Sequence, residues 1–165
     1  MITKHKDAAL ANRFGRLPFM VMALLGMAFA VPALAASSHA QIRAKTRAME
    51  VAANAHDTDG FLKPFWHGPR LLFVINGRVI RGYKALHAQQ LEWWKHGKSD
   101  AHYTQTAPMQ FMDLAPGVVA TTQHLSSRRA GPDGKVQTGT FAVTNIWKHQ
   151  GGHWEIVYAH ESWAR

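Results

Sequence analysis

The C-terminal stretch His153–Trp163 places residues that could do acid/base chemistry at alternate positions of an expected strand. In an extended chain alternate side chains share a face, so Tyr158, His160 and Ser162 continue a row of large apolar side chains. An imidazole can act as an acid or a base near neutral pH, and a phenol two residues away can donate a proton or a hydrogen bond. We predict His160 and Tyr158 as catalytic residues; a structural role at a pocket wall is the alternative for His160.

A turn before this stretch sets the strand that must face it. Gly151-Gly152 predicts a two-residue turn, and a regular ladder from that turn places Asn145 opposite Tyr158. Asn145 and Ser162 would then lie on the same face as His160. We predict both as ligand-binding residues.

His124 belongs to the preceding expected strand, and its face depends on a longer loop. If Gly131–Gly134 is a four-residue loop, His124 lies opposite Phe141 and joins the face of His160. A one-residue bulge would turn His124 to the other face. His124 is therefore a predicted ligand-binding residue whose placement stays open.

The elements that must position these residues follow from periodicity and turn signals. Helices come first and strands afterwards, which predicts an α+β domain with helices packed on one face of an antiparallel sheet. The expected helices are Gln41–His56, a short piece within Phe61–Trp66, and Tyr83–His96; the expected strands are Leu71–Ile75, Arg78–Ile80 after an Asn76-Gly77 turn, His102–Met112, Val118–Arg129, Val136–Lys148 and His153–Ala164.

Aromatic residues lie on or beside the expected helices. Trp66, Tyr83 and Trp94 could each be ordinary core, since a domain of this size must bury large side chains. Apolar walls with few polar groups also describe a pocket for a small molecule. We include these three among the predicted ligand-binding residues.

The N-terminal segment resembles a secretory leader. Basic residues at Lys4, Lys6, Arg13 and Arg16 precede an apolar run, and Ala33-Leu34-Ala35 has the small residues of a cleavage site. The run is shorter than the roughly 20 apolar residues of a membrane-spanning helix. We therefore expect residues 1–35 to be a signal peptide and residues 36–165 to be one exported domain, periplasmic or secreted, with no membrane span after cleavage.

Composition excludes several classes of function. The sequence has no cysteine, which excludes disulfides and thiol catalysis. Its formal charge of +9 includes four basic residues and one acidic residue of the leader, and the positive residues after the leader are scattered. Scattered charge and export both argue against a nucleic-acid partner. The histidines lack the spacing of a metal site, so we expect no metal and no other cofactor.

The order of elements and several short motifs resemble the SnoaL-like branch of the nuclear-transport-factor-2-like superfamily. The resemblance covers about residues 41–162. It rests on the glycine after the first hairpin (Gly82), on the strand around Asn145 and Trp147, and on the G-G-x-W and terminal H-x-S motifs that end in His160 and Ser162.

This resemblance implies a cone-like fold in which a curved sheet wraps around the helices and encloses an apolar cavity, often in a homodimer. The superfamily includes isomerases, dehydratases and cyclases beside non-catalytic binding and assembly modules, so the fold leaves the function open. Its ketosteroid isomerases rely on a buried aspartate, and the expected strand Leu71–Ile75 has no carboxylate.

Two functions follow from these observations. One is an exported protein that binds a small hydrophobic or aromatic molecule, with acid/base turnover left open. The alternative is a non-catalytic interaction or assembly module that binds its partner through the outer face of the sheet, where Val157 and Trp163 would be exposed.

Overall fold

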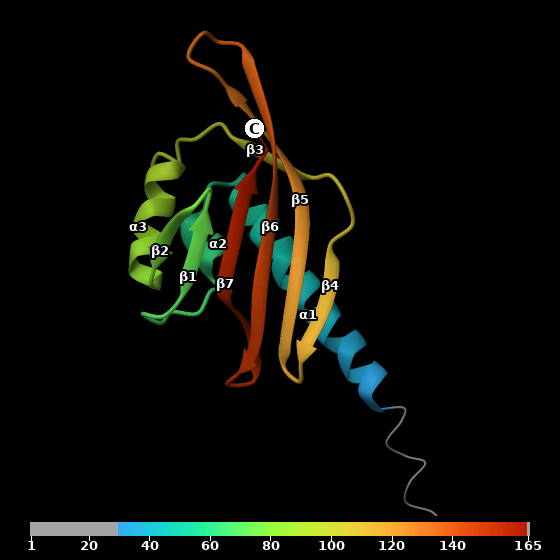
Figure 1. Ribbon diagram of the computed structural model, residues 1–165. Helices are drawn as coiled ribbons and strands as arrows, with labels where there is room; N and C mark the ends of the chain where they lie inside the picture. The colour runs from blue at the N-terminus through green and yellow to red at the C-terminus, as the bar shows by residue number, and fades with distance from the viewer. Residues whose placement is uncertain (1–29, 165) are drawn as a thin grey trace, which may run out of the picture.

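The computed structural model describes residues 30–164, with side chains from Ala36 onward (Figure 1). The predicted leader, residues 1–35, lies outside the described residues except for the helical backbone from Ala30. The elements in chain order are α1 (Ala30–Asn54), α2 (Thr58–Leu62), β1 (Leu72–Ile75), β2 (Arg78–Arg81), α3 (Tyr83–Trp93), β3 (His102–Gln105), β4 (Gln110–Ala115), β5 (Val118–Ala130), β6 (Val136–Gln150) and β7 (His153–Trp163).

Helix α1 lies behind the sheet in Figure 1 and packs its apolar stripe against it. Ile42, Met49 and Ala53 recur at helical spacing on this stripe and are buried. The helix ends at Asn54, and His56 follows in a left-handed conformation (φ 53°). Asp57 then caps α2, since its carboxylate accepts the Gly60 N–H at 3.0 Å.

The predicted hairpin at Asn76-Gly77 is confirmed. Both turn residues have positive φ (46° and 84°), as the tightest hairpin turns require. Strand β1 pairs antiparallel with β2 on one side and parallel with β7 on the other. The sheet is therefore mixed, whereas the sequence predicted an antiparallel one.

The seven strands form one sheet in the order β2-β1-β7-β6-β5-β3, and β4 also pairs with β5. The sequence predicted one strand over His102–Met112, but a segment containing Pro108 divides it into β3 and β4. Proline has no N–H to donate to a ladder, which explains the break. β3 pairs with the second half of β5 and β4 with the first half.

A β-bulge at Val157 changes the face of every later residue in β7. The predicted register holds from the Gly151-Gly152 turn to the pair Trp147/Ile156, but Ile146 then pairs with Tyr158, which leaves Val157 unopposed. The bulge lies where β7 changes its other neighbour. Ile156 exchanges backbone hydrogen bonds with the segment Pro64–Trp66, whereas Tyr158 and the residues after it pair with β1.

The loop between β5 and β6 also differs from the prediction by one residue. Ala130 pairs with Val136, so five residues form the loop, and His124 lies opposite Ala142 rather than Phe141. His124 consequently faces away from the helices, which is the outcome that the sequence had left open.

The core lies between the helices and the inner face of the sheet. Trp147 is its largest fully buried side chain (0% exposed), and its indole N–H donates to the Thr121 hydroxyl at 2.9 Å. Ile42, Leu62 and Ile156 are also fully buried in this cluster. Three members of this cluster also line a cavity: Met49, Phe65 and Phe73.

Candidate ligand-binding cavity

A cavity of about 490 Å³ lies between the inner face of the sheet and the three helices. This volume is in the range of sites for small molecules. Eight aromatic side chains line it: Phe61, Phe65, Phe73, Trp93, Trp94, Tyr103, Phe141 and Trp163. The predicted internal cavity is therefore present, and its walls combine these aromatic rings with polar side chains.

The last two strands contribute the polar groups of the cavity floor. Asn145 pairs with Ala159, and Val143 pairs with Glu161, so Asn145 and Glu161 are diagonal neighbours on the inner face. The next pair is Phe141 with Trp163, whose rings stack at 4.3 Å. The bulge at Val157 brings Glu161 and Trp163 to this face.

Glu161 is a carboxyl group in an apolar setting. Its Oε1 accepts the indole N–H of Trp163 at 2.5 Å. Burial raises the pKa of Glu161 above the ordinary carboxyl value, and the hydrogen bond from Trp163 offsets only part of this rise. Within residues 30–164, Glu161 has no ion-pair partner.

Asn145 supplies an acceptor that the protein leaves unused. The residue is 2% exposed, and its Oδ1 has no hydrogen-bond partner in the described part of the chain. Leaving such a buried acceptor unpaired costs about 1–3 kcal/mol. A ligand that donates a hydrogen bond here would remove this cost.

The wall opposite the floor is held by side-chain bonds between α1, α3 and β3. Asn54 clamps the backbone of Tyr103, accepting its N–H at 2.7 Å and donating to its carbonyl at 3.0 Å. The Tyr103 hydroxyl accepts the indole N–H of Trp94 at 3.1 Å. Burial raises the pKa of Tyr103, so the phenol is neutral at physiological pH.

Glu50 of α1 also lines the cavity. Its carboxylate accepts a hydrogen bond from the Gln123 amide at 2.9 Å, which links α1 to β5. A second acidic group thus faces the cavity from the helical side.

Of the predicted site residues, the structure brings only Asn145 and Trp94 to the cavity. The placement predicted for Tyr158, His160 and Ser162 is wrong, because the bulge turns all three to the outer face. His124 and Ser162 instead share a shallow recess there. The two remaining aromatic residues lie outside the cavity: Tyr83 stacks on His67 at 3.8 Å, and Trp66 lies beside Arg70.

Sequence reasoning missed Glu161, Trp163, Tyr103 and Glu50. One signal could have found the first two. The apolar row of Trp154 and Ile156 continues at Ala159 and Trp163 only if one extra residue is inserted between them.

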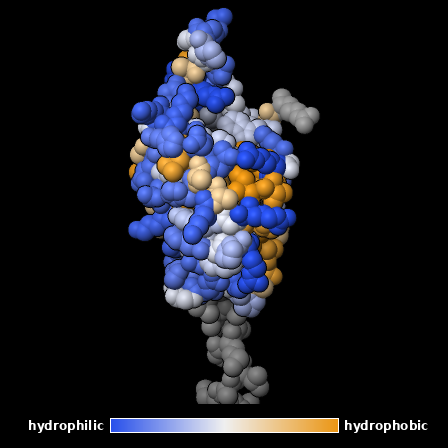
Figure 2. Space-filling model, turned by 90° about the vertical axis from the view of Figure 1, so that its left-hand side faces the viewer, coloured by the Kyte–Doolittle hydropathy of each residue, from blue (hydrophilic) through white to orange (hydrophobic). Residues whose placement is uncertain are grey.

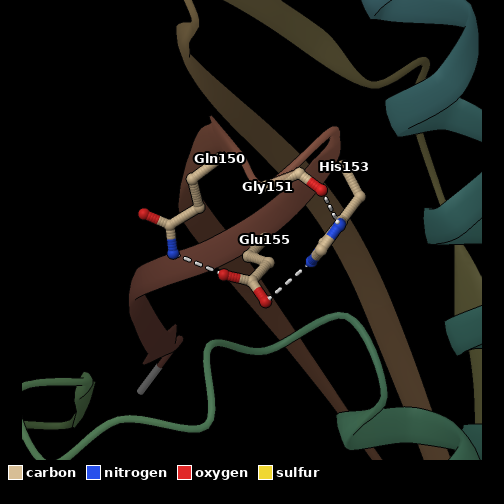
Figure 3. Close-up of polar contacts among 4 residues, drawn as sticks. All are labelled: Gln150, Gly151, His153 and Glu155. Carbon is tan, nitrogen blue, oxygen red and sulfur yellow. Dashed lines mark hydrogen bonds and ion pairs between the residues drawn. The ribbon is translucent and has the colours of Figure 1, made fainter.

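The opposite end of β6 and β7 is closed by a small polar cluster around the Gly151-Gly152 turn (Figure 3). His153 lies between the Gly151 carbonyl (Nδ1 to O 2.9 Å) and Glu155 (Nε2 to Oε1 3.2 Å). The Gln150 amide donates to the other Glu155 oxygen at 2.5 Å. These contacts fix the turn and hence the register of the hairpin up to the bulge.

No group of three or more His, Asp or Glu side chains within residues 30–164 is placed to hold a metal ion. No helix of the same range is long and apolar enough to cross a membrane.

The charge of Glu161 should lower the stability of the empty protein at neutral pH. Because its pKa is raised, the folded state binds this proton more tightly than the unfolded chain does. Its contribution is fully present below the unfolded pKa and is lost as pH rises through the folded pKa. Glu161→Gln should therefore raise the melting temperature at pH 7 in thermal scans, and this gain should shrink toward acidic pH.

The exposed Glu92 provides the control for this prediction. Glu92→Gln should shift the melting temperature little at either pH, because surface substitutions change stability by less than about 0.5 kcal/mol. If Glu161→Gln were less stable than the wild type at pH 7, the account of Glu161 as a destabilising, partly buried carboxylate would be wrong.

Comparison with known proteins identifies the fold. No protein-family model matches the chain, and no curated protein matches it in sequence. A protein of unknown function from Shewanella oneidensis, described as NTF-2 like, matches with a TM-score of 0.62 and 19% identity, covering 75% of this chain and 98% of its own. A nuclear transport factor 2-like superfamily protein from Salmonella enterica matches with a TM-score of 0.67 and 16% identity, covering 79% and 94%.

The association domain of calcium/calmodulin-dependent protein kinase II from C. elegans is also similar, with a TM-score of 0.61 and 16% identity, covering 76% of this chain and 98% of that domain. At these identities the similarity concerns the fold. Together with the α+β order of elements and the aromatic cavity, it shows that the chain has the fold of nuclear transport factor 2-like proteins.

Proposed function

We propose that the protein binds a small, mostly apolar molecule in the aromatic cavity, with Glu161 and Asn145 contacting its polar part. The observation that carries this proposal is the unpaired Asn145 Oδ1 beside a partly buried carboxyl group that lines the same cavity. A ligand that pairs with both groups would offset the cost of leaving them without a partner.

The proposal is limited to binding. Glu161 is the acid/base group that the cavity floor offers, whereas His160 and Tyr158 lie on the other face of the sheet. The resemblance to SnoaL-like proteins supports a ligand cavity of this kind. The basic and apolar leader supports export, with residues 1–35 removed.

A neutral fluorescent probe, N-phenyl-1-naphthylamine, tests the binding proposal. Val143 lines the cavity opposite Glu161, so Val143→Trp should fill the floor and abolish saturable probe binding in a fluorescence titration. The next residue, Thr144, faces outward, and Thr144→Trp is the matched control that should keep binding. Equal binding by both variants, or no saturable binding by the wild type, would overturn the proposal.

A second candidate function is assembly through the outer face of the sheet. Five residues of adjacent strands form an apolar row across this face: Leu72, Tyr158, Ile146, Ala120 and Met112. Met112 is 64% exposed at the end of the row. Figure 2 shows hydrophobic surface along its right-hand margin, the side on which the outer face lies. We propose that a second copy of the chain covers the row, giving a homodimer.

This proposal predicts how one substitution changes the mass in solution. Met112→Lys should convert the dimer to a monomer in sedimentation equilibrium, because a lysine in the row would be buried without a partner. Val51→Lys is the control, since Val51 is 72% exposed on α1, away from the sheet. A wild-type protein that is monomeric at micromolar concentration would contradict the proposal. The sequence predicted Val157 and Trp163 as exposed residues of the outer face. This is wrong for Trp163, because Trp163 lines the cavity.

A further inference from the structure

We propose that the ligand is an organic cation, an aromatic or alicyclic amine whose ammonium group lies between the Glu161 carboxylate and Asn145 Oδ1. This inference rests on the proposed function and names the class of molecule that the cavity takes. It is carried by three features of the cavity: the kind of polar atom on its floor, the missing countercharge, and the aromatic walls.

Two acceptors on the floor have no partner among the described residues. They are Asn145 Oδ1, which is buried, and the Glu161 carboxyl oxygen that Trp163 does not use. As diagonal neighbours on adjacent strands, these two side chains have backbone positions roughly 7–8 Å apart. An ammonium group has three N–H donors and no acceptor, so one such group between them can bond to both.

Glu161 also lacks a positive partner. The other ionisable side chains that line the cavity are Glu50 of α1, His102 and Tyr103 of β3, and Arg129 of β5. Arg129 is exposed, and its charge acts on Tyr103 and Asp100. The nearest ionisable neighbours of Glu161 on its own strand, Tyr158 and His160, face the opposite side of the sheet. The raised pKa of Glu161 is consistent with a carboxyl group whose countercharge must come from outside the chain.

The walls favour a cation over a neutral molecule of the same shape. The faces of Trp and Phe rings attract a desolvated cation by about 2 kcal/mol or more in a buried site. Trp93, Trp94 and Trp163 all line the cavity, and Trp163 also holds the Glu161 carboxyl group through its indole N–H. An amine with an apolar body would bury that body against these rings and its charge against Glu161.

Three compounds of matched shape test the inference: 2-(1-naphthyl)ethylamine, 2-(1-naphthyl)ethanol and 1-naphthylacetate. Isothermal titration of the full-length protein at pH 7 should give at least about tenfold tighter binding of the amine than of the alcohol, because hydrogen bonds to charged groups are the stronger ones. The carboxylate should bind more weakly than either. In Glu161→Gln the ratio of amine to alcohol affinity should fall by about tenfold, and only the preference that the aromatic rings supply should remain.

The pH dependence gives a second readout. The amine's affinity should rise with pH by up to about tenfold per unit until Glu161 is ionised, whereas the alcohol's should stay flat. His160→Gln is the matched control, because His160 is the preceding residue on the opposite face, and it should leave the ratio unchanged.

Each other outcome has a distinct meaning. If the wild type binds the alcohol as tightly as the amine, the amine inference is overturned and the proposed binding function stands. If none of the three compounds binds saturably, both are overturned. If Glu161→Gln leaves the ratio of amine to alcohol affinity unchanged, Glu161 does not select the amine and the assignment fails.

Discussion

Trp147→Ala should lower the free energy of unfolding by about 3–5 kcal/mol, the range for removing a large aromatic side chain from a packed core. Trp147 is the largest fully buried side chain described, and it lies between the helices and the centre of the sheet. Its removal would leave a cavity and would also deprive the buried Thr121 hydroxyl of its donor. Urea unfolding followed by circular dichroism measures the loss.

Two variants separate the contributions of volume and hydrogen bonding at this position. Trp147→Phe keeps most of the ring but removes the indole N–H, so it should cost about 1–3 kcal/mol. Trp66→Ala is the control for a partly exposed tryptophan and should cost less than Trp147→Ala. A loss below about 1 kcal/mol for Trp147→Ala would contradict the central role of this residue in the core.

Gly82→Ala should lower the free energy of unfolding by about 1–3 kcal/mol, the cost of holding a residue with a side chain in a strained backbone conformation. Gly82 begins α3 with φ 84° and ψ 149°, a region almost restricted to glycine. Its N–H donates to the Leu71 carbonyl at 2.8 Å, and an added Cβ would lie 3.4 Å from the Pro69 carbonyl. This contact is an ordinary van der Waals one, so the expected cost comes from the backbone conformation.

The same substitution should also weaken ligand binding, since α3 carries Trp93 and Trp94 to the cavity wall. Urea unfolding measures the loss of stability, and fluorescence titration with N-phenyl-1-naphthylamine measures the loss of binding. Gly134→Ala is the control: Gly134 also has positive φ (75°), but it lies in the exposed β5–β6 loop with open space around it. Gly134→Ala should lower the free energy of unfolding less than Gly82→Ala does. Equal losses would show that the Gly82 environment adds nothing to the backbone strain.

Local signals in the sequence were sufficient for the α+β class and for most of its elements, but not for the parallel pairing of β1 with β7. Asn76-Gly77 predicts a hairpin because few other dipeptides accept two positive φ angles, and the structure confirms it. Helical spacing predicted α1 and α3, and alternating strands after them predicted the α+β class. Each of these features depends on residues close together in the chain.

The site was harder to predict because it depends on one residue of register. The bulge at Val157 coincides with the change of neighbour from Pro64–Trp66 to β1, and both neighbours are far from β7 in sequence. The Gly151-Gly152 turn predicts the correct strand pairs up to Trp147 and Ile156. It does not predict the pairs beyond the bulge. Asn145 was placed correctly because it lies on β6. On β7 the bulge places Glu161, and not His160, on the cavity face.

The unopposed residue Val157 determines which single-codon deletions in β7 would keep the cavity face unchanged. Val157 is the one position in the strand that no residue of β6 opposes. An in-frame loss of its codon would straighten the strand and leave Ile156, Ala159 and Glu161 on their present faces, since each would keep its partner on β6. The two sides of the last half of this strand hold different sets of functional groups, carboxyl and indole on one and imidazole and phenol on the other. A one-codon insertion or deletion after the bulge would therefore exchange the set of groups that faces the cavity. The same deletion at the bulge itself would leave that set unchanged.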